Sequence, residues 1–407
     1  MTLIVQKYGG TSVATPERIR AVARRIALEH QKGVSVVVVV SAMGHTTDEL
    51  IDLAEKVSPS PSDREMDMLL TAGERISMSL LSMALADLGV AAVSFTGSQA
   101  GIVTTRSHRR ARIVRIQGDR VREAIRSGRV AIVAGFQGVS DLREITTLGR
   151  GGSDTTAVAL ASVLQADQCE IFTDVDGVYS ADPRVVAGAR MISKLPHELM
   201  VELATRGAGV LHPRSVELAK QGNVRLLVKN SLKEPTHGQG TLCTELVSGA
   251  DFMNQGLEEL RVIGVTADAG KARVWLQGSL DQVSSTLCAF SKERQLAMVS
   301  AVFSSNSFEF FCERDAAHEW DSWIEGLLKS AVIEAGGVDR ETVPVSVVGE
   351  RFTQDSAALG EVLTVLREAG IRPHGGSISS LGLTVGVVSS QAKTAVQALH
   401  RHFFPEA

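Results

Sequence analysis

The sequence predicts an α/β protein with a mostly parallel sheet, followed by a half made of two small β-α-β-β-α-β modules. Three observations support this prediction: buried apolar strands that end in glycine-rich loops, amphipathic helices between those strands, and a change of pattern near Arg261. From there on, short apolar strands alternate with single helices. The 407 residues exceed one average core, so two or three domains are expected.

The first 45 residues predict a complete strand–helix–strand unit. Leu3–Val5 is a short apolar strand followed by a loop with two glycines. Thr15 and Pro16 are a typical N-cap and first helical residue, and predict a helix to about Gln31. Val36–Val40 is a continuous β-branched run, typical of a strand buried on both faces of a parallel sheet.

The same patterns continue along the chain. Helices are predicted at 46–57, 63–88, 197–205 and 213–221; strands at 91–95, 130–134, 169–173 and 225–228; and a hairpin at 141–147. In the C-terminal half, strands are predicted at 262–265, 272–276, 307–312, 343–348 and 383–388, with helices at 280–294, 320–335, 357–369 and 392–402. The boundary between the two modules is expected near 335–345.

The residues best suited to bind a ligand lie just before the apolar run Ala157–Leu164. Ser153 is a good N-cap, and a helix that begins there would direct its N–H groups and its positive dipole end at an anion. Gly151 and Gly152 would let the backbone approach that anion. Arg150 adds a charge that can bind a carboxylate or phosphate with two donors. The alternative is an ordinary glycine-rich turn and a capped helix.

The next strand, Cys169–Thr173, delivers two carboxylates, Asp174 and Asp176, at its end. In an open α/β sheet, ligands bind outside the carboxyl ends of the strands. An anion-binding loop and a carboxylate pair are therefore expected at one edge of the sheet.

Composition excludes several classes of function. A net charge of −4 gives no electrostatic case for binding nucleic acid or an anionic membrane. The four cysteines lie far apart, which argues against a zinc site or a disulfide scaffold and suits a reducing compartment. No secretory signal and no apolar run near the roughly 18 residues of a membrane span are present. We expect a soluble cytoplasmic protein.

Two common catalytic motifs are absent from the sequence. The chemistry that it then supports best is phosphoryl transfer at a site that has no P-loop. Gly264–Lys271 has the wrong spacing for a Walker A loop, and there is no nucleophile elbow. Lys7, in a glycine-rich loop, could bridge the transferring group, and a carboxylate acceptor would need no general base. Glu74 would repel such an anionic substrate unless the substrate also carried an ammonium group, which favours an amino acid. A solvent-facing position on its helix is the alternative for Glu74.

Seven segments in order resemble the aspartate kinases of the amino-acid kinase family: VQKYGGTSV, VVVSAM, LLTAGERIS, SFTGSQAG, VAGFQG, TTLGRGGSDTTAVALA and TDVDGVYSADPR. The resemblance is dense over residues 1 to about 245, and the C-terminal half looks like the family's paired ACT domains. It implies an amino-acid-kinase-type αβα sandwich over 1–246, a linker over 247–260, and ferredoxin-like ACT domains over 261–340 and 341–407.

The implied reaction is phosphorylation of the side-chain carboxylate of L-aspartate by ATP, giving 4-phospho-L-aspartate on the route to lysine, threonine, methionine and diaminopimelate. Mg²⁺ is implied as an ion held by the phosphates, with no protein metal ligand expected. The family implies a homo-oligomer, or a hetero-oligomer with a regulatory subunit started at Met253.

The resemblance also implies roles for individual residues. Lys7 matches the cation at the transferring phosphoryl group, Glu74 the partner of the substrate ammonium, Arg150 the clamp on its α-carboxylate, and Asp154 a further catalytic position. The substrate-binding set is Thr47, Glu74, Arg150, Gly151, Gly152 and Ser153. The nucleotide-binding set is Lys7, Gly9, Gly10, Ser41, Thr173, Asp174, Tyr179 and Arg184.

Two departures from the family pattern stand out. Gly209 occupies the position where the family has a lysine that reaches the nucleotide; either Arg206 replaces that cation or ATP binding is weakened. The loops Gln277–Asp281 and Gly349–Asp355 lack the Pro-Gly turn of the family's effector loops. Feedback inhibition by lysine or threonine is therefore in doubt.

Three alternatives to a feedback-regulated aspartate kinase stay open. The first is a feedback-insensitive paralogue that serves a specialised pathway. The second is a kinase of the same fold acting on glutamate or acetylglutamate, which the LTAGERIS segment disfavours. The third is a catalytically inactive amino-acid sensor, which Gly209 favours and the four retained groups Lys7, Glu74, Arg150 and Asp154 disfavour.

Overall fold

The computed structural model describes residues 2–233, 242–249, 261–294, 296–355 and 357–405. The chain divides into two compact units. The first contains residues 1–178, 191–197 and 210–252, and the second contains 179–190, 198–209 and 253–407. The predicted catalytic domain, 1–246, therefore gives two of its segments to the second unit. Most of the predicted linker lies outside the described residues.

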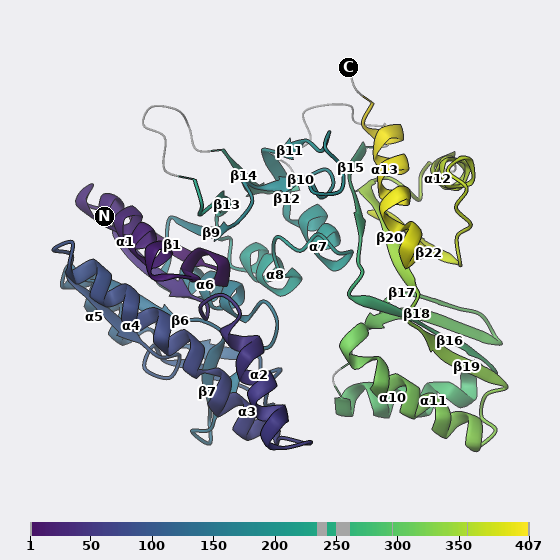
Figure 1. The fold of residues 1–407 in the computed structure, drawn as a ribbon, viewed down its shortest axis with the longest axis horizontal. Coiled ribbons are helices and arrows are strands. Elements are labelled where there is room, and N and C mark those ends of the chain that lie inside the picture. Colours follow the sequence, from purple (N-terminus) through teal and green to yellow (C-terminus); the bar gives the residue numbers. More distant parts are fainter. Residues whose placement is uncertain (1, 234–241, 250–260, 295, 356, 406–407) are drawn as a thin grey trace. The chain divides into compact units, whose positions relative to one another are not determined.

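The first unit is built on an eight-stranded sheet in the order β12-β14-β13-β9-β1-β2-β6-β3 (Figure 1). Pairs β9–β1, β1–β2, β2–β6 and β6–β3 are all parallel. The strands are β1 (Leu3–Tyr8), β2 (Ser35–Val40), β3 (Ala92–Phe95), β6 (Val130–Ala134), β9 (Gln168–Thr173), β12 (Lys194–Pro196), β13 (Leu226–Asn230) and β14 (Cys243–Val247). A mostly parallel sheet is what the sequence predicted.

Helices cover both faces of this sheet, which explains why every residue of β2 is buried. Helices α1 (Pro16–Gln31) and α4 (Ala72–Ala86) pack on one face against alternate valines of β2. Helix α6 (Gly152–Leu164) packs on β1, β2 and β9 beside α8 (Pro213–Gln221). The first unit also contains α2 (Thr46–Val57), α3 (Asp63–Leu70) and α5 (Asp119–Arg126).

A second, four-stranded sheet in the first unit has the order β5-β4-β7-β8. Strands β7 and β8 form the predicted hairpin. The bounds are β4 (Ile102–Thr104), β5 (Ile113–Ile116), β7 (Gln137–Ser140) and β8 (Ile145–Thr147). The sheet packs against α3 through β8.

The predicted single helix over 63–88 is wrong, because it divides at Thr71 into α3 and α4. The Thr71 carbonyl accepts a hydrogen bond from Gln137 Nε2 at 3.2 Å. A Cβ on Gly73 would lie 2.7 Å from Ala42 Cβ, so this glycine allows the first turn of α4 to approach the loop after β2.

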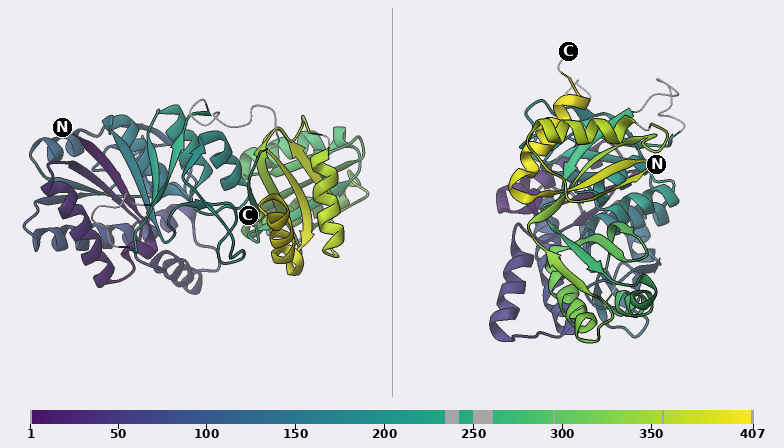
Figure 2. Two further views of the ribbon diagram at one scale, coloured as in Figure 1. Left: turned by 90° about the horizontal axis from the view of Figure 1, so that it is seen from above. Right: turned by 90° about the vertical axis from the view of Figure 1, so that its right-hand side faces the viewer.

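The second unit contains two four-stranded sheets, β15-β20-β22-β21 and β17-β18-β16-β19. The strands are β15 (Arg261–Ala267), β16 (Lys271–Gln277), β17 (Val299–Phe303), β18 (Ser307–Glu313), β19 (Ala335–Asp339), β20 (Thr342–Glu350), β21 (Gly376–Ser379) and β22 (Gly382–Val388). Helices α10 (Leu280–Arg294) and α11 (Ala317–Lys329) contribute to a core of apolar and aromatic residues around Trp320. Helices α12 (Ala357–Glu368) and α13 (Ala392–Phe403) pack on one face of the β20–β22 sheet (Figure 2).

The two modules do not follow one another along the chain as the sequence predicted. Strand β15 pairs antiparallel with β20, from Arg261 opposite Glu350 to Ala267 opposite Val345. Strand β19 instead pairs with β16. One module is therefore built from residues 261–267 and 342–403, and the other, 271–339, is inserted between these two segments. A division at 340/341 separates β15 from its own sheet.

Two segments from the first half of the sequence complete the second unit. Ala181, Val185, Val186 and Ala189 pack into the core formed by β15, β20, β22, α12 and α13. Helix α7 (His197–Thr205) contributes the other segment together with the turn that follows it. The chain also forms β10 (Val178–Tyr179) and β11 (Met191–Ile192), which pair with each other.

Candidate functional site

The candidate site lies at the carboxyl edge of the large sheet, where loops after β1, β2 and β9 meet. Backbone hydrogen bonds join these loops: Gly9 N donates to Phe172 O at 3.3 Å, and Gly44 N donates to Gly10 O at 3.1 Å. A Cβ on Gly10 would lie 3.1 Å from Ala42 O, so this position requires close backbone approach. The predicted edge is therefore formed.

Lys7, near the end of β1, forms an ion pair of 2.6 Å with Asp154 Oδ1 on the first turn of α6. Both side chains are largely buried, with 13% and 11% exposed. The two predicted catalytic residues therefore come together from distant positions in the sequence. An ion pair with low exposure holds its ammonium in a defined place more effectively than a surface pair would.

Helix α6 begins slightly earlier than predicted, because Gly151 and not Ser153 is its N-cap. Gly151 has φ of +69°, and a Cβ there would lie 2.1 Å from the ring of His212. Glycine is thus required at this position. Ser153 lies inside the first turn, where it packs against Gly135, and Gly152 packs against Phe136. Arg150, directly before the cap, is exposed.

Glu74 is buried, with 3% exposed, so its predicted alternative as a solvent-facing residue is wrong. Its Oε1 accepts from the Ala42 backbone N–H at 3.2 Å, while Oε2 is buried without a hydrogen-bond partner among the described residues. Burial raises the pKa of this carboxyl to about 7. A buried carboxylate oxygen of this kind is a suitable acceptor for a cationic ligand group.

Ser41 and Thr47 flank the same loop after β2. Ser41 N donates to Tyr8 O at 3.1 Å, which fixes the loop beside the end of β1. Thr47 is the second residue of α2, and both residues are half-buried. The loop thus places Ser41 near the lysine-bearing strand and Thr47 toward the helix that follows.

The predicted nucleotide-binding residues fall in both units. Thr173 Oγ1 donates to Asp174 Oδ1 at 3.1 Å at the end of β9. Beside them, Asp176 accepts from Asn230 Nδ2 at 2.9 Å and forms an ion pair with Lys233 at 2.7 Å. Tyr179 and Arg184 belong to the second unit, where the exposed Arg184 guanidinium forms an ion pair with Asp182.

The hypothesis that Arg206 replaces the family's nucleotide-site lysine is wrong. Its guanidinium is buried in the second unit, where it donates to Glu202 Oε2 at 2.9 Å, to Ser379 Oγ at 3.1 Å and to Thr384 Oγ1. All three nitrogens are therefore engaged. A Cβ on Gly209 would meet no atom within 4 Å, so a side chain there has room.

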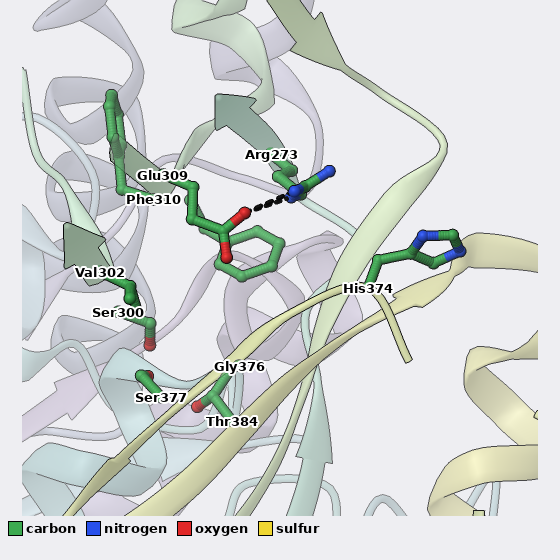
Figure 3. A pocket seen from close by; sticks show the side chains of 10 residues that line it. Arg273, Ser300, Val302, Glu309, Phe310, His374, Gly376, Ser377 and Thr384 are labelled. Atoms are coloured by element: carbon green, nitrogen blue, oxygen red, sulfur yellow. Dashed lines mark hydrogen bonds and ion pairs between the residues drawn. The ribbon is translucent and has the colours of Figure 1, made fainter. Parts of the chain in front are cut away.

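A small cavity lies between the two modules of the second unit, lined by Arg273, Glu309, His374 and neighbouring residues (Figure 3). Arg273 and Glu309 form an ion pair at its wall. Its volume of about 10 Å³ corresponds to roughly one water molecule. An amino-acid effector does not fit this cavity in the conformation described.

Within the described ranges, no three His, Cys, Asp or Glu side chains come together as a candidate metal site. No helix of the described chain has the length and apolar character needed to cross a membrane.

Sequence reasoning missed Gly73 and Asp67. Gly73 allows Glu74 to reach the Ala42 amide, and the only signal in the sequence was its place directly before Glu74. Asp67 is fully buried in α3, between Met66 and Leu70. An acidic residue within an apolar helix face was its signal.

Comparison with known proteins agrees with this geometry. The family model described as "Amino acid kinase family" matches residues 2–230. An aspartokinase of Corynebacterium glutamicum is 43% identical, over 99% of this chain and 96% of its own length. An aspartokinase of Bacillus sp. is 42% identical, over 99% of this chain and 97% of its own. The crystal structure of E. coli aspartokinase III in complex with aspartate and ADP shares the fold, with a TM-score of 0.82, 23% identity, and coverage of 99% and 100%.

A chain with this fold, this lysine-bearing sheet edge and a family match over more than half its length belongs to the amino acid kinase family. Within that family the two full-length relatives named above are aspartokinases, as the seven sequence segments predicted, and the chain is a phosphotransferase of that kind.

Proposed function

We propose that this chain transfers the γ-phosphoryl group of ATP to the side-chain carboxylate of L-aspartate, giving 4-phospho-L-aspartate, the first intermediate toward lysine, threonine, methionine and diaminopimelate. One observation carries the proposal. The loop after β2 borders both the Lys7 strand and the buried, unpartnered oxygen of Glu74, so a phosphate-binding cation and an ammonium acceptor share one sheet edge. That combination suits an amino acid that is phosphorylated.

Lys7 neutralises charge on the transferring phosphoryl group, and Asp154 holds the lysine ammonium in place through the 2.6 Å ion pair. An aspartate carboxylate is already anionic at neutral pH, so no base has to remove a proton. One carboxylate oxygen forms the new bond to the γ-phosphorus while the bond from that phosphorus to the bridging oxygen breaks. ADP leaves with the electron pair.

Groups on either side of this reaction centre bind the amino-acid substrate. Glu74 Oε2 accepts from the α-ammonium, and Arg150 binds the α-carboxylate, as a guanidinium does with two parallel donors. Thr47 and the first turn of α6, with Gly151, Gly152 and Ser153, complete the substrate side. The N–H groups of this turn and the helix dipole favour negative charge.

Gly9, Gly10 and Ser41 line the phosphate side of the proposed nucleotide site, and Thr173 and Asp174 provide further contacts. Tyr179 and Arg184 remain nucleotide-binding residues only by the resemblance to the family. A Mg²⁺ ion would rely on phosphate oxygens and water for most of its ligands. When bound, Mg²⁺ neutralises the charge of the phosphates. With Gly209 in place of a lysine and Arg206 engaged elsewhere, ATP affinity is reduced.

The second unit is the part of the chain to which we assign assembly and any response to an effector. We propose a homo-oligomer formed through edge strands of the two small sheets, because exposed edges pair readily. A regulatory subunit started at Met253 is the alternative, and Met253 lies outside the described residues. The absent Pro-Gly turns favour an enzyme that is insensitive to lysine and threonine.

The test is an assay of the full chain with L-aspartate, ATP and Mg²⁺, in which hydroxylamine traps the acyl phosphate as a hydroxamate. We expect a hydroxamate with L-aspartate and not with L-glutamate, unchanged by lysine plus threonine. No hydroxamate at saturating ATP contradicts the proposed function. Strong inhibition by the two amino acids contradicts the insensitive second unit alone.

A further inference from the structure

Asp67 is a buried carboxylate that the proposed reaction does not use. It is 0% exposed, in α3, a helix that does not carry any of the predicted site residues. Its oxygens accept from Thr147 Oγ1 at 2.6 Å, from the Arg109 backbone N–H at 3.0 and 3.1 Å, and lie 2.8 Å from His108 Nδ1. Burying a charge this completely is costly unless it is fully hydrogen-bonded, as it is here.

Two of these contacts lead directly to the loop that carries Arg150. Thr147, at the end of β8, stands three residues before Arg150. Arg109 has φ of +61°, an unfavourable conformation for a residue with a side chain, and Asp67 binds its N–H. The Arg109 carbonyl in turn packs under Gly149, where a Cβ would lie only 2.9 Å away.

The opposite wall of this loop is fixed by α8. Arg214 Nη1 donates to Leu148 O at 2.8 Å, and the ring of His212 packs against Gly151. Arg150 therefore lies in a short segment, 147–151, that is contacted on one side by Asp67 and Arg109 and on the other by residues of α8 and its N-cap. Asp67, which holds one side of this segment, lies on the helix that leads to the other end of the proposed substrate site.

That second connection runs along the chain. Thr71 N donates to the backbone carbonyl of Asp67 at 3.2 Å at the end of α3, as in an ordinary helical turn, and Gln137 Nε2 donates to the Thr71 carbonyl. Helix α4 begins at the next residue and carries Glu74 in its first turn. Helix α3 therefore contacts the Arg150 loop through Asp67. At its C-terminal end it leads directly into α4, the helix that carries Glu74.

We propose that Asp67 is a positioning residue that sets the separation between Glu74 and Arg150, and thereby the fit to the α-ammonium and α-carboxylate of the amino-acid substrate. This inference rests on the proposed function, because it concerns the same substrate site. Asp67 touches neither the substrate nor the nucleotide side, so its loss changes amino-acid recognition more than ATP recognition.

The matched pair Thr147→Val and Thr146→Val tests the proposal in the full chain. Both threonines are 0% exposed and adjacent on β8. The Thr146 hydroxyl pairs with Thr104 Oγ1 at 2.6 Å, whereas the Thr147 hydroxyl binds Asp67. Both substitutions delete one buried hydroxyl, so a structural role alone would affect the two variants alike.

We expect Thr147→Val to raise the KM for L-aspartate about tenfold, as the loss of one hydrogen bond to a charged group predicts, with the KM for ATP within about twofold. Its preference for L- over D-aspartate in kcat/KM should fall by a similar factor. Thr146→Val should leave both quantities near the wild-type values, and Thr147→Val should lose at least as much in Tm as Thr146→Val, because its bond is to a carboxylate.

Asp67→Asn provides the second variant, since it keeps the shape of the side chain and removes its charge. It should change the same two quantities in the same direction. Equal KM values for L-aspartate in Thr147→Val and Thr146→Val, or a rise in the KM for ATP as large as that for aspartate, would overturn the inference alone. A wild-type chain that forms no hydroxamate would overturn the proposed function and this inference together.

Discussion

Two buried charged groups in this molecule differ in one respect, and the difference indicates where ligands bind. Arg206, in the second unit, directs all of its guanidinium nitrogens at protein partners on α7, β21 and β22. Glu74, in the first unit, has one oxygen bound to the Ala42 amide and the other without a partner among the described residues. Buried polar groups are normally satisfied, so an exception in a native protein requires an explanation.

The explanation we favour is that Arg206 stabilises its unit while Glu74 keeps one oxygen for a ligand. Glu74 stands in the first turn of α4 and Arg206 directly after α7, and both are buried, with 3% and 7% exposed. Charge and burial therefore do not distinguish these two residues; the unused hydrogen-bonding capacity of Glu74 does. Four predictions test this comparison.

The largest effect is expected at the reaction centre. Lys7→Ala removes the cation that Asp154 positions, and we expect kcat to fall about 10³-fold, comparable with loss of a major electrostatic contact to the transition state. Steady-state hydroxamate assays measure this. The control is Lys32→Ala, whose exposed ammonium pairs with Glu29, and it should keep full activity. A Lys7→Ala variant that keeps most of the wild-type kcat contradicts the assigned role.

Glu74→Gln is expected to raise the KM for L-aspartate about 30-fold, because a charge-assisted hydrogen bond to the ammonium becomes a neutral one. The same variant should unfold at a higher Tm at about pH 8. Burial raises the Glu74 pKa from 4.5 to about 7, so the folded state is progressively penalised as pH rises from 4.5 to about 7; the full cost is present at about pH 8, and glutamine avoids it. Differential scanning fluorimetry on the ligand-free chain measures the second effect; a lower Tm argues for a structural Glu74.

The contrast with Arg206 predicts an effect on ATP. Gly209→Lys places a cation at the position where the resemblance to the family implies one, in open space, and should lower the KM for ATP about tenfold. Arg206→Met, by comparison, should lower Tm and leave the KM for ATP unchanged, because its nitrogens are bound within the second unit. A large rise in the KM for ATP in Arg206→Met would reinstate it as a nucleotide ligand.

The smallest effect concerns pH. Only the ionised form of Glu74 attracts an ammonium, and its pKa is about 7. As pH falls through about 7, the carboxyl gains its proton and aspartate binding weakens, so the KM for L-aspartate should rise about threefold from about pH 7.5 to about pH 6.5. Glu74→Gln should abolish this dependence. A wild-type KM that is constant over this range excludes Glu74 as the titrating group.

Much of the fold was predictable from local patterns. Thr15 and Pro16 mark the start of α1, and Thr15 Oγ1 does accept from Arg18 N–H at 3.3 Å. The valine run of β2 predicted a strand buried on both faces. These features depend on neighbours in sequence, which is why the sequence alone contains them.

The errors arose where distant segments decide the outcome. The helix cap is Gly151 and not the predicted Ser153. The residues next to Gly151 in the sequence do not indicate that the ring of His212 lies against it. Likewise, β15 and the strands of the inserted module have similar apolar patterns, so pattern alone does not show that β15 pairs with β20. Two partners of Arg206, Ser379 and Thr384, lie 173 and 178 residues away in sequence.

The insertion of residues 271–339 has a consequence for how such a chain arose and how it can be altered. The end of β15 and the start of β20, which border the inserted module, lie next to each other, since Asp268 N donates to Pro344 O at 3.1 Å. A segment whose two ends lie close together can be replaced by another domain while the surrounding module keeps its fold, as in other tolerated domain insertions. The host module thus offers an attachment point at which a different module can replace residues 271–339 without a change in the order of the other strands.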